Sequence, residues 1–163
     1  MRVIGIDPGY DRLGVSIIEQ INGKEKLLFS STIQTSSKDK FIKRMYQLGV
    51  ELERIIKEYK PNFFAIEKLY FNSNQKTATN VSEVRGALIF LALQNNLEVF
   101  EYTPLQIKVA ITGQGRADKK QVIFMVDRLI KINKKIKYDD EYDAIACGLT
   151  FLAVDGRKII KKT

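Results

Sequence analysis

The first third of the chain shows hydrophobic patterns that are typical of β-strands. A short apolar run lies within Arg2–Asp7 and is followed at once by turn-forming residues. Leu13–Gln20 and Glu25–Thr35 are predicted as two further strands. They are connected through Asn22-Gly23, and this dipeptide is the strongest short-range signal for a β-hairpin. The chain is therefore predicted to begin with three strands arranged as a meander.

A helical pattern follows these strands. Ser36 and Asp39 have the spacing of a capping box, and apolar residues then recur at helical intervals from Phe41 to Tyr59. A fourth strand is predicted at Pro61–Glu67, where consecutive apolar side chains indicate burial. The next segment, Lys68–Lys76, has no hydrophobic period and is predicted to be a loop.

The second half of the chain combines helical patterns with one more strand. Its predicted elements are a helix at Thr79–Gln94, a strand at Leu97–Tyr102, a short helix from Pro104, a helix with apolar residues spaced from Val122 to Ile130, and a last helix from Asp139 or Asp140 to about Val154. The first of these helices is apolar on nearly every side from Ala87 to Leu93. It is therefore expected either to be a fully buried core helix or to lie in an interface.

The order of these elements predicts the fold class. A meander followed by strands that alternate with helices implies an α/β protein whose five-stranded mixed sheet has helices on both faces. With 163 residues and no internal repeat, we expect a single domain at residues 1–155 and a short basic tail at 156–163. No apolar run approaches the roughly 20 residues that span a bilayer, and Asp7 interrupts any signal-like stretch, so a cytoplasmic location is expected.

The composition removes several classes of active site. There is no histidine, which excludes a Ser-His-Asp triad and zinc sites that use histidine. Cys147 is the only cysteine, so it can form neither an internal disulfide nor a four-cysteine metal site. Any catalysis must then depend on carboxylates, lysines, hydroxyls or hard metal ions held by oxygen.

Positive charge is concentrated in one part of the sequence. The formal net charge is +8, and the segment from Pro104 to Lys137 contributes +7 of it, with nine basic residues against two acidic ones. The basic residues are Lys108, Arg116, Lys119, Lys120, Arg128, Lys131, Lys134, Lys135 and Lys137. Such a field is typical of a surface that binds a polyanion such as nucleic acid, and a merely solvated lysine-rich surface is the alternative.

Four carboxylates stand out by position. Asp7 ends the first predicted strand and Glu67 ends the fourth, so both project from one sheet edge if these strands are parallel neighbours. Asp140 and Asp143 share a face of the last helix. Small residues follow them and allow this helix to approach the sheet; they are Ala144, Ala146 and Gly148.

Four clustered carboxylates repel one another unless cations offset their charge. Two divalent ions about 3.5–4 Å apart resolve this conflict and support phosphoryl transfer without histidine. Each residue also has a structural alternative. Asp7 can serve a simple turn, and Asp139 or Asp140 can be a helix N-cap. No structural role is evident for Glu67.

Several blocks of sequence, in order along nearly the whole chain, carry a family resemblance. They are Gly5-Ile6-Asp7-Pro8-Gly9, Ala65-Ile66-Glu67, Arg85-Gly86, the segment from Phe100-Glu101-Tyr102 to Gln121-Val122, and Asp140-Glu141-Tyr142-Asp143-Ala144-Ile145-Ala146. Together they resemble the RuvC family of Holliday junction resolvases, which are crossover junction endodeoxyribonucleases. The resemblance implies an RNase H-like fold.

The resemblance also implies an active site. Asp7, Glu67, Asp140 and Asp143 would be the catalytic residues and would hold Mg²⁺, or Mn²⁺ in its place, with two ions per site. Asp139 is a rival of Asp140, because Asp139 and Asp143 have helical spacing too. The spacing of the family's motif favours Asp140.

The implied activity is cleavage of four-way (Holliday) DNA junctions in homologous recombination and DNA repair. Two strands of like polarity would be nicked symmetrically, leaving 5′-phosphate and 3′-hydroxyl ends. The implied partners are the junction, a second copy of the chain packed against helix 79–94, and a bacterial branch-migration complex of RuvA and RuvB. The alternatives are an RNase H-like nuclease that acts on another nucleic acid, and a non-catalytic junction-binding protein.

Contacts with DNA are implied as well. Tyr70 matches an aromatic residue that stacks on a base near the cut, and Phe71 is its rival. Lys108 and Lys119 match lysines of the family that touch the backbone near the scissile phosphate. Weaker candidates for phosphate contacts are Lys68, Lys76, Arg116 and Lys120.

Overall fold

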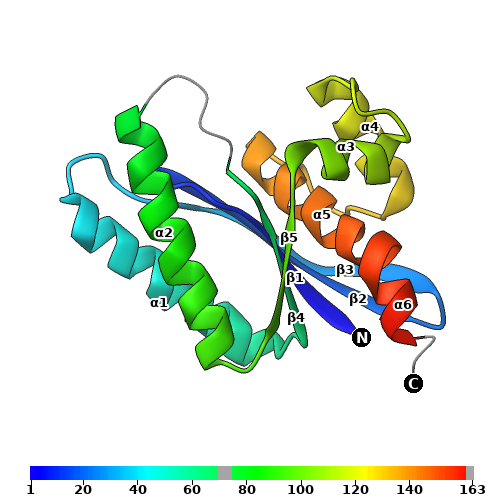
Figure 1. Ribbon diagram of the computed structural model, residues 1–163, viewed down its shortest axis with the longest axis horizontal. Helices are drawn as coiled ribbons and strands as arrows, with labels where there is room; N and C mark the ends of the chain where they lie inside the picture. The colour runs from blue at the N-terminus through cyan, green and yellow to red at the C-terminus, as the bar shows by residue number, and fades with distance from the viewer. Residues whose placement is uncertain (70–74, 161–163) are drawn as a thin grey trace.

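The computed structural model describes residues 1–69 and 75–160, and a five-stranded sheet forms its centre (Figure 1). The strands are β1 (Arg2–Asp7), β2 (Arg12–Ile21), β3 (Lys24–Gln34), β4 (Phe63–Glu67) and β5 (Glu98–Tyr102). They lie in the order β3-β2-β1-β4-β5, with antiparallel pairing from β3 to β1 and parallel pairing from β1 to β5. The predicted mixed sheet is confirmed.

Helices cover both faces of this sheet (Figure 1), which completes the expected RNase H-like α/β architecture. They are α1 (Phe41–Tyr59), α2 (Gln75–Gln94), α3 (Pro104–Thr112), α4 (Lys119–Leu129), α5 (Asp139–Phe151), a π-helical turn (Leu152–Gly156) and α6 (Arg157–Ile160). α1 and α2 pack together on one face, and α5 lies on the other with α3 and α4 beside it. None of the helices in the described residues is long and apolar enough to cross a membrane.

Alternation along the strands sends neighbouring side chains into two separate cores. In β1, Ile4 and Ile6 pack in the core beneath α1 and α2, whereas Val3 packs in the core beneath α5. β4 follows the same rule, with Ala65 on the α5 side and Ile66 on the opposite side. Because side chains alternate with a period of two, the last residue of each of these strands faces α5.

The predicted capping box before α1 is wrong. The N-cap residue is Lys40, and its side chain makes no capping hydrogen bond. The Ser36 hydroxyl instead accepts a hydrogen bond from the backbone N–H of Lys38 at 3.2 Å, and Asp39 pairs with Lys43 at 2.7 Å. The backbone N–H of Asp39 donates a hydrogen bond to the Ser36 carbonyl and closes a local turn. Ser36 and Asp39 therefore make their hydrogen bonds within or beside this turn and do not cap the helix.

The apolar helix α2 has two different sides. Val84, Leu88 and Ala92 are buried against the sheet, whereas Phe90 is 66% exposed and Leu93 is 56% exposed. A fully buried core helix is therefore excluded, and the outward side of α2 remains open to a partner. The helix also starts at Gln75, before the position expected from the sequence.

The C-terminal end of the domain continues as helix. α5 runs through the π-helical turn into α6, so residues 157–160 of the expected basic tail are helical. The hydroxyl of Tyr102 on β5 donates a hydrogen bond to Asp155 at 2.6 Å, and this bond ties the turn to the sheet. The boundary between residues 155 and 156 stays a prediction.

Candidate active site

Two candidate carboxylates end neighbouring parallel strands. β1 and β4 pair in parallel with Ile6 opposite Ile66, so Asp7 and Glu67 follow at the same edge of the sheet. Alternation turns both side chains toward α5. The neighbourhood that the sequence predicted for these two residues is therefore observed.

Two glycines allow the first half of α5 to lie directly on the sheet. A Cβ atom on Gly14 of β2 would be 1.9 Å from the carbonyl oxygen of Asp140, and one on Gly5 of β1 would be 2.2 Å from that of Ala144. Ser16 donates a hydrogen bond to the Ala144 carbonyl at 2.9 Å, which fixes the helix at this place. The predicted close approach is thus observed, and small residues on the strands contribute to it as well as those on the helix.

Burial, and after it the charges of neighbouring carboxylates, raise the pKa of three acidic groups in this region. Burial raises the pKa of Asp7 well above its usual value, and the charges of Asp143, Glu67 and Asp140 raise that pKa further. Burial, followed by the Asp143 charge, raises the pKa of Glu67 to about 7. Burial also raises the pKa of Asp143, although its hydrogen bond with Lys119 acts in the opposite direction. The four predicted carboxylates form one electrostatic cluster.

Lys119 brings a positive charge to this cluster. It is the first residue of α4, whose start is fixed by a capping box between Asp118 and Gln121. Its ammonium group pairs with Asp143 and lies 3.5 Å from Asp139. Burial lowers the pKa of Lys119, but the hydrogen bond to Asp143 and the charges of Asp143, Asp139 and Asp7 together raise that pKa overall. Lys119 is therefore a partner of a candidate catalytic carboxylate.

Arg12 brings a second positive charge that the sequence did not reveal. Its Nε atom lies 3.1 Å from Oδ2 of Asp140, and its guanidinium carbon lies 5.2 Å from the centroid of the Tyr138 ring. The Asp140 Oδ2 atom is buried and has no hydrogen-bond partner of acceptable geometry within the described residues. The contact is therefore a charge–charge pair rather than a hydrogen bond.

A pocket of about 200 Å³ opens beside the cluster. Glu67 and Asp143 line it together with Lys108 and Lys119. The charges of both lysines oppose the rise in the pKa of Glu67. Two lysines predicted to contact DNA and two candidate catalytic carboxylates therefore share one pocket.

The other predicted DNA contacts lie elsewhere. Arg116 and Lys120 are exposed and do not line this pocket. Lys120 instead lines a larger groove of about 550 Å³ between the end of α3 and α4. Tyr70 and Phe71 fall outside the described residues. The basic segment is also used internally, because Lys134 pairs with the buried Glu141 of α5.

The predicted N-cap role for the α5 aspartates is wrong. Tyr138 is the N-cap residue, and Asp139 and Asp140 lie within the first helical turn. The Asp140 charge raises the pKa of both Asp7 and Asp143, whereas the Asp139 charge acts on Asp143 alone of the two, and the Asp139 side chain is 57% exposed. The structure thus favours Asp140 over its rival as a member of the cluster.

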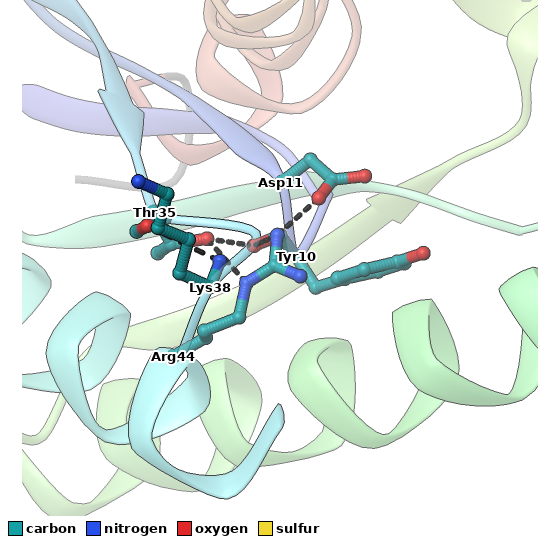
Figure 2. A network of polar contacts seen from close by, with 6 residues as sticks. Tyr10, Asp11, Thr35, Lys38 and Arg44 are labelled. Carbon is teal, nitrogen blue, oxygen red and sulfur yellow. Dashed lines mark hydrogen bonds and ion pairs between the residues drawn. The ribbon is translucent and has the colours of Figure 1, made fainter. Parts of the chain in front are cut away.

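A buried arginine anchors the loop that follows Asp7. Figure 2 shows Arg44 of α1 pointing toward Tyr10, Asp11 and Thr35. Arg44 is 7% exposed, donates to the Thr35 hydroxyl at 2.8 Å and to the Tyr10 carbonyl at 3.2 Å, and pairs with Asp11. Within residues 1–69 and 75–160, no hydrogen bond to the Asp7 side chain contributes to this turn. Arg44, rather than the Asp7 carboxylate, therefore holds this turn.

The cluster suits a hard divalent cation in charge and in donor type. As the side chains stand, no three acidic or cysteine residues in the described part of the chain surround one point as metal ligands. The candidate ligands are nevertheless all carboxylates, and burial together with the neighbouring acidic charges raises the pKa of Asp7 and Glu67, so their charged forms lack a compensating cation. Oδ2 of Asp140, which accepts no hydrogen bond within the described residues and faces Arg12, is a further oxygen that a cation could bind.

Known proteins share both the sequence and the fold of this chain. A family model described as crossover junction endodeoxyribonuclease RuvC matches residues 3–151. The crossover junction endodeoxyribonuclease RuvC of Caldicellulosiruptor saccharolyticus is 47% identical over 150 residues, which cover 91% of this chain and 90% of that protein. The protein of the same name from Finegoldia magna is 46% identical over 149 residues and 91% of each chain.

Solved structures agree with these relatives. Thermus thermophilus RuvC in complex with a Holliday junction substrate superposes with a TM-score of 0.87 at 27% identity and covers 94% of this chain and 93% of its own. A further structure of Thermus thermophilus RuvC gives a TM-score of 0.83 at 28% identity, covering 96% and 97% of the two chains. Sequence, fold and the acidic cluster lead to one conclusion: this chain belongs to the RuvC family of crossover junction endodeoxyribonucleases.

Proposed function

We propose that this protein resolves four-way DNA junctions as a structure-selective endodeoxyribonuclease in recombination and repair. The observation that carries the proposal is the half-buried carboxylate cluster at the ends of β1 and β4, where burial and the charges of neighbouring carboxylates raise the pKa of Asp7 and Glu67. The solved complex of Thermus thermophilus RuvC with a Holliday junction supports the choice of substrate. We expect paired nicks on strands of like polarity, with 5′-phosphate and 3′-hydroxyl ends.

Asp7, Glu67, Asp140 and Asp143 are the residues that would hold divalent metal, which we propose to be Mg²⁺, with Mn²⁺ as a substitute and two ions per site. Bound ions of this kind supply Lewis-acid stabilisation to a reacting phosphate. The protein's own contribution is to hold four oxygen donors at the end of a rigid sheet. Lys108 lines the same pocket and can bind a phosphate oxygen beside these carboxylates.

The direct test is cleavage of a labelled four-way junction in Mg²⁺, beside linear duplex DNA and an RNA–DNA hybrid of the same sequence. The expected result is a pair of symmetric nicks on the junction and no cutting of the linear controls. Equal cutting of the hybrid would support an RNase H-like nuclease with another substrate. Tight junction binding without nicks, in Mg²⁺ and in Mn²⁺, would support a non-catalytic junction-binding protein.

We propose that the DNA lies across α3 and α4. Lys108 and Lys119 would contact phosphates near the cut, Arg116 and Lys120 would contact phosphates farther away, and Tyr70 or Phe71 would stack on a base. The exposure of Arg116 and Lys120 supports their part in this surface.

Junction affinity should fall steeply with salt, because bound phosphates release counterions. Lys120→Gln is expected to weaken binding and to reduce the slope of log K against log salt by about one. Lys57→Gln is the control, because Lys57 pairs with Glu53 on α1, away from this surface. A slope that Lys120→Gln leaves unchanged would remove Lys120 from the proposed surface, and a flat plot for the unaltered protein would contradict backbone binding.

We further propose a homodimer formed through α1 and α2. The outward side of α2 exposes Phe90 and Leu93, and α1 beside it exposes a stripe at helical spacing made of Ile42, Tyr46 and Val50. A twofold dimer would offer two active sites to a nearly symmetric junction. We also propose that the RuvA and RuvB branch-migration complex is a partner and that the protein is cytoplasmic. Residues 1–155 are proposed to form the nuclease domain.

A further inference from the structure

Arg12 forms an ion pair with Asp140, which is one of the four candidate metal ligands. It is the first residue of β2, and its Nε atom lies 3.1 Å from Asp140 Oδ2. The Asp140 side chain is 18% exposed and that of Arg12 is 44% exposed, so the pair lies at the rim of the cluster. The Asp140 charge in turn raises the pKa of Asp7, so the carboxylate that Arg12 contacts is a member of the cluster.

Both members of this pair are held in place by their own elements. Arg12 pairs with Gln34 across β2 and β3, and its guanidinium lies over the Tyr138 ring at 5.2 Å. The backbone of Asp140 is seated against Gly14, two residues along β2 from Arg12. The backbone positions of Arg12 and Asp140 are therefore fixed relative to each other, and the Tyr138 ring restricts the Arg12 side chain.

We propose that Arg12 is a positioning residue that acts as a built-in counter-cation for Asp140 and competes with divalent metal for this carboxylate. The inference rests on the proposed function, in which Asp140 is a metal ligand. An arginine held at one oxygen of a carboxylate repels a divalent ion that approaches the same carboxylate and offsets part of the negative charge that would attract the ion. Asp140 then binds Arg12 when the cluster is free of metal and exchanges it for metal when the site is loaded.

The test measures metal binding by the full-length protein without DNA. Mn²⁺ is titrated into the unaltered protein and into Arg12→Gln, and free Mn²⁺ is followed by electron paramagnetic resonance. Arg12→Gln is expected to bind Mn²⁺ about three- to tenfold more tightly, because the competing charge is lost while partial exposure limits its effect. Arg12→Lys keeps the charge and should bind Mn²⁺ nearly as weakly as the unaltered protein.

Arg54→Gln is the matched control, because Arg54 forms ion pairs with Glu51 and Glu58 on the exposed side of α1. It should leave Mn²⁺ affinity unchanged. If Arg12→Gln folds poorly, Arg12→Met retains a long aliphatic side chain at this position without the charge and is expected to tighten Mn²⁺ binding similarly. Thermal unfolding of each variant establishes which of them fold.

A double-mutant comparison separates competition at Asp140 from a general change in charge. In an Asp140→Asn background, Arg12→Gln should alter Mn²⁺ affinity by less than about twofold, because the shared carboxylate is gone. If Arg12→Gln and the unaltered protein bind Mn²⁺ equally, the proposed competition is wrong. The same holds if Arg12→Gln tightens Mn²⁺ binding equally with Asp140 and with Asn at position 140. Either result leaves the metal site of the proposed function intact. Failure of the unaltered protein to bind Mn²⁺ at all overturns the metal site of the proposed function.

Discussion

Replacing Asp7 by Asn is expected to abolish junction cleavage and, in the same preparation, to raise the melting temperature of the metal-free protein. Burial and the charges of Asp143, Glu67 and Asp140 raise the pKa of Asp7, which means that the folded protein disfavours the charged form. Asparagine has nearly the same shape and no charge. For a chain of this size, the melting temperature should rise by about 2–4 °C for each kcal/mol gained when this buried and repelled charge is removed.

Loss of activity should accompany this gain in stability. Stabilisation of a reacting phosphate by metal contributes several kcal/mol, so removal of a central ligand should slow cleavage by about a thousandfold or more. Junction affinity in Ca²⁺ should change far less, because it depends mainly on the lysines of α3 and α4. Gel cleavage assays and calorimetry in EDTA measure the two effects separately.

The pH dependence of the metal-free protein follows from the same shifts. An acid whose pKa is raised by folding stabilises the fold while it is protonated and loses that contribution as pH rises through the folded-state pKa. The unfolding free energy should therefore decline from about pH 4, the unfolded value of such groups, through the region near pH 7 where Glu67 titrates. Asp7→Asn should make this decline shallower.

Asp39 provides the control of opposite sign. Its hydrogen bond and ion pair with Lys43 lower its pKa, so Asp39→Asn should slightly lower the melting temperature and leave cleavage intact. A clear drop in melting temperature on Asp7→Asn would contradict the proposed repulsion. It would indicate instead that the Asp7 carboxylate makes contacts that stabilise the turn.

The sequence was sufficient to place Asp7 and Glu67 because a strand fixes two things at once. Its end defines the edge of the sheet, and its alternation defines the face, so two carboxylates at the ends of parallel neighbours must meet. The small residues after Asp143 likewise predicted that α5 would approach the sheet, and Gly5 and Gly14 complete that contact. Sequence patterns with a fixed period were therefore sufficient to predict that Asp7, Glu67 and α5 lie close together.

The pairings of the charged side chains could not be predicted in the same way. Arg12 meets Asp140 and Lys119 meets Asp143 across different elements, and no spacing in the sequence distinguishes these cations from others nearby. The capping box proposed for Ser36 failed for a related reason, since a local turn competes for the same groups. Sequence pattern fixes backbone periodicity, whereas long side chains choose partners only after the elements have packed.

Gly14→Ala is expected to be among the most destabilising single-methyl changes in the protein and to remove activity without touching a carboxylate. The added Cβ would lie 1.9 Å from the Asp140 carbonyl oxygen and 2.7 Å from its carbonyl carbon, both of which are backbone atoms. Overpacking of a core commonly lowers the free energy of unfolding by about 1–3 kcal/mol. Because backbone atoms cannot move aside as a flexible side chain can, we expect a loss of about 3 kcal/mol or more here. The first turn of α5 must move away from β2.

The displacement of that turn distinguishes this variant from an ordinary loss of stability. Moving α5 carries Asp140 and Asp143 away from the ends of β1 and β4, so cleavage at a temperature where the variant is still folded should fall at least about tenfold. Gly49→Ala is the control, because a Cβ on Gly49 of α1 meets no atom within 4 Å and should stabilise the helix by about 0.5–1 kcal/mol. Denaturant unfolding and single-turnover cleavage on the same samples measure both quantities. A Gly14→Ala protein that unfolds earlier yet cuts at the normal rate when folded would show that the contact between α5 and β2 supports the fold without setting the geometry of the carboxylates.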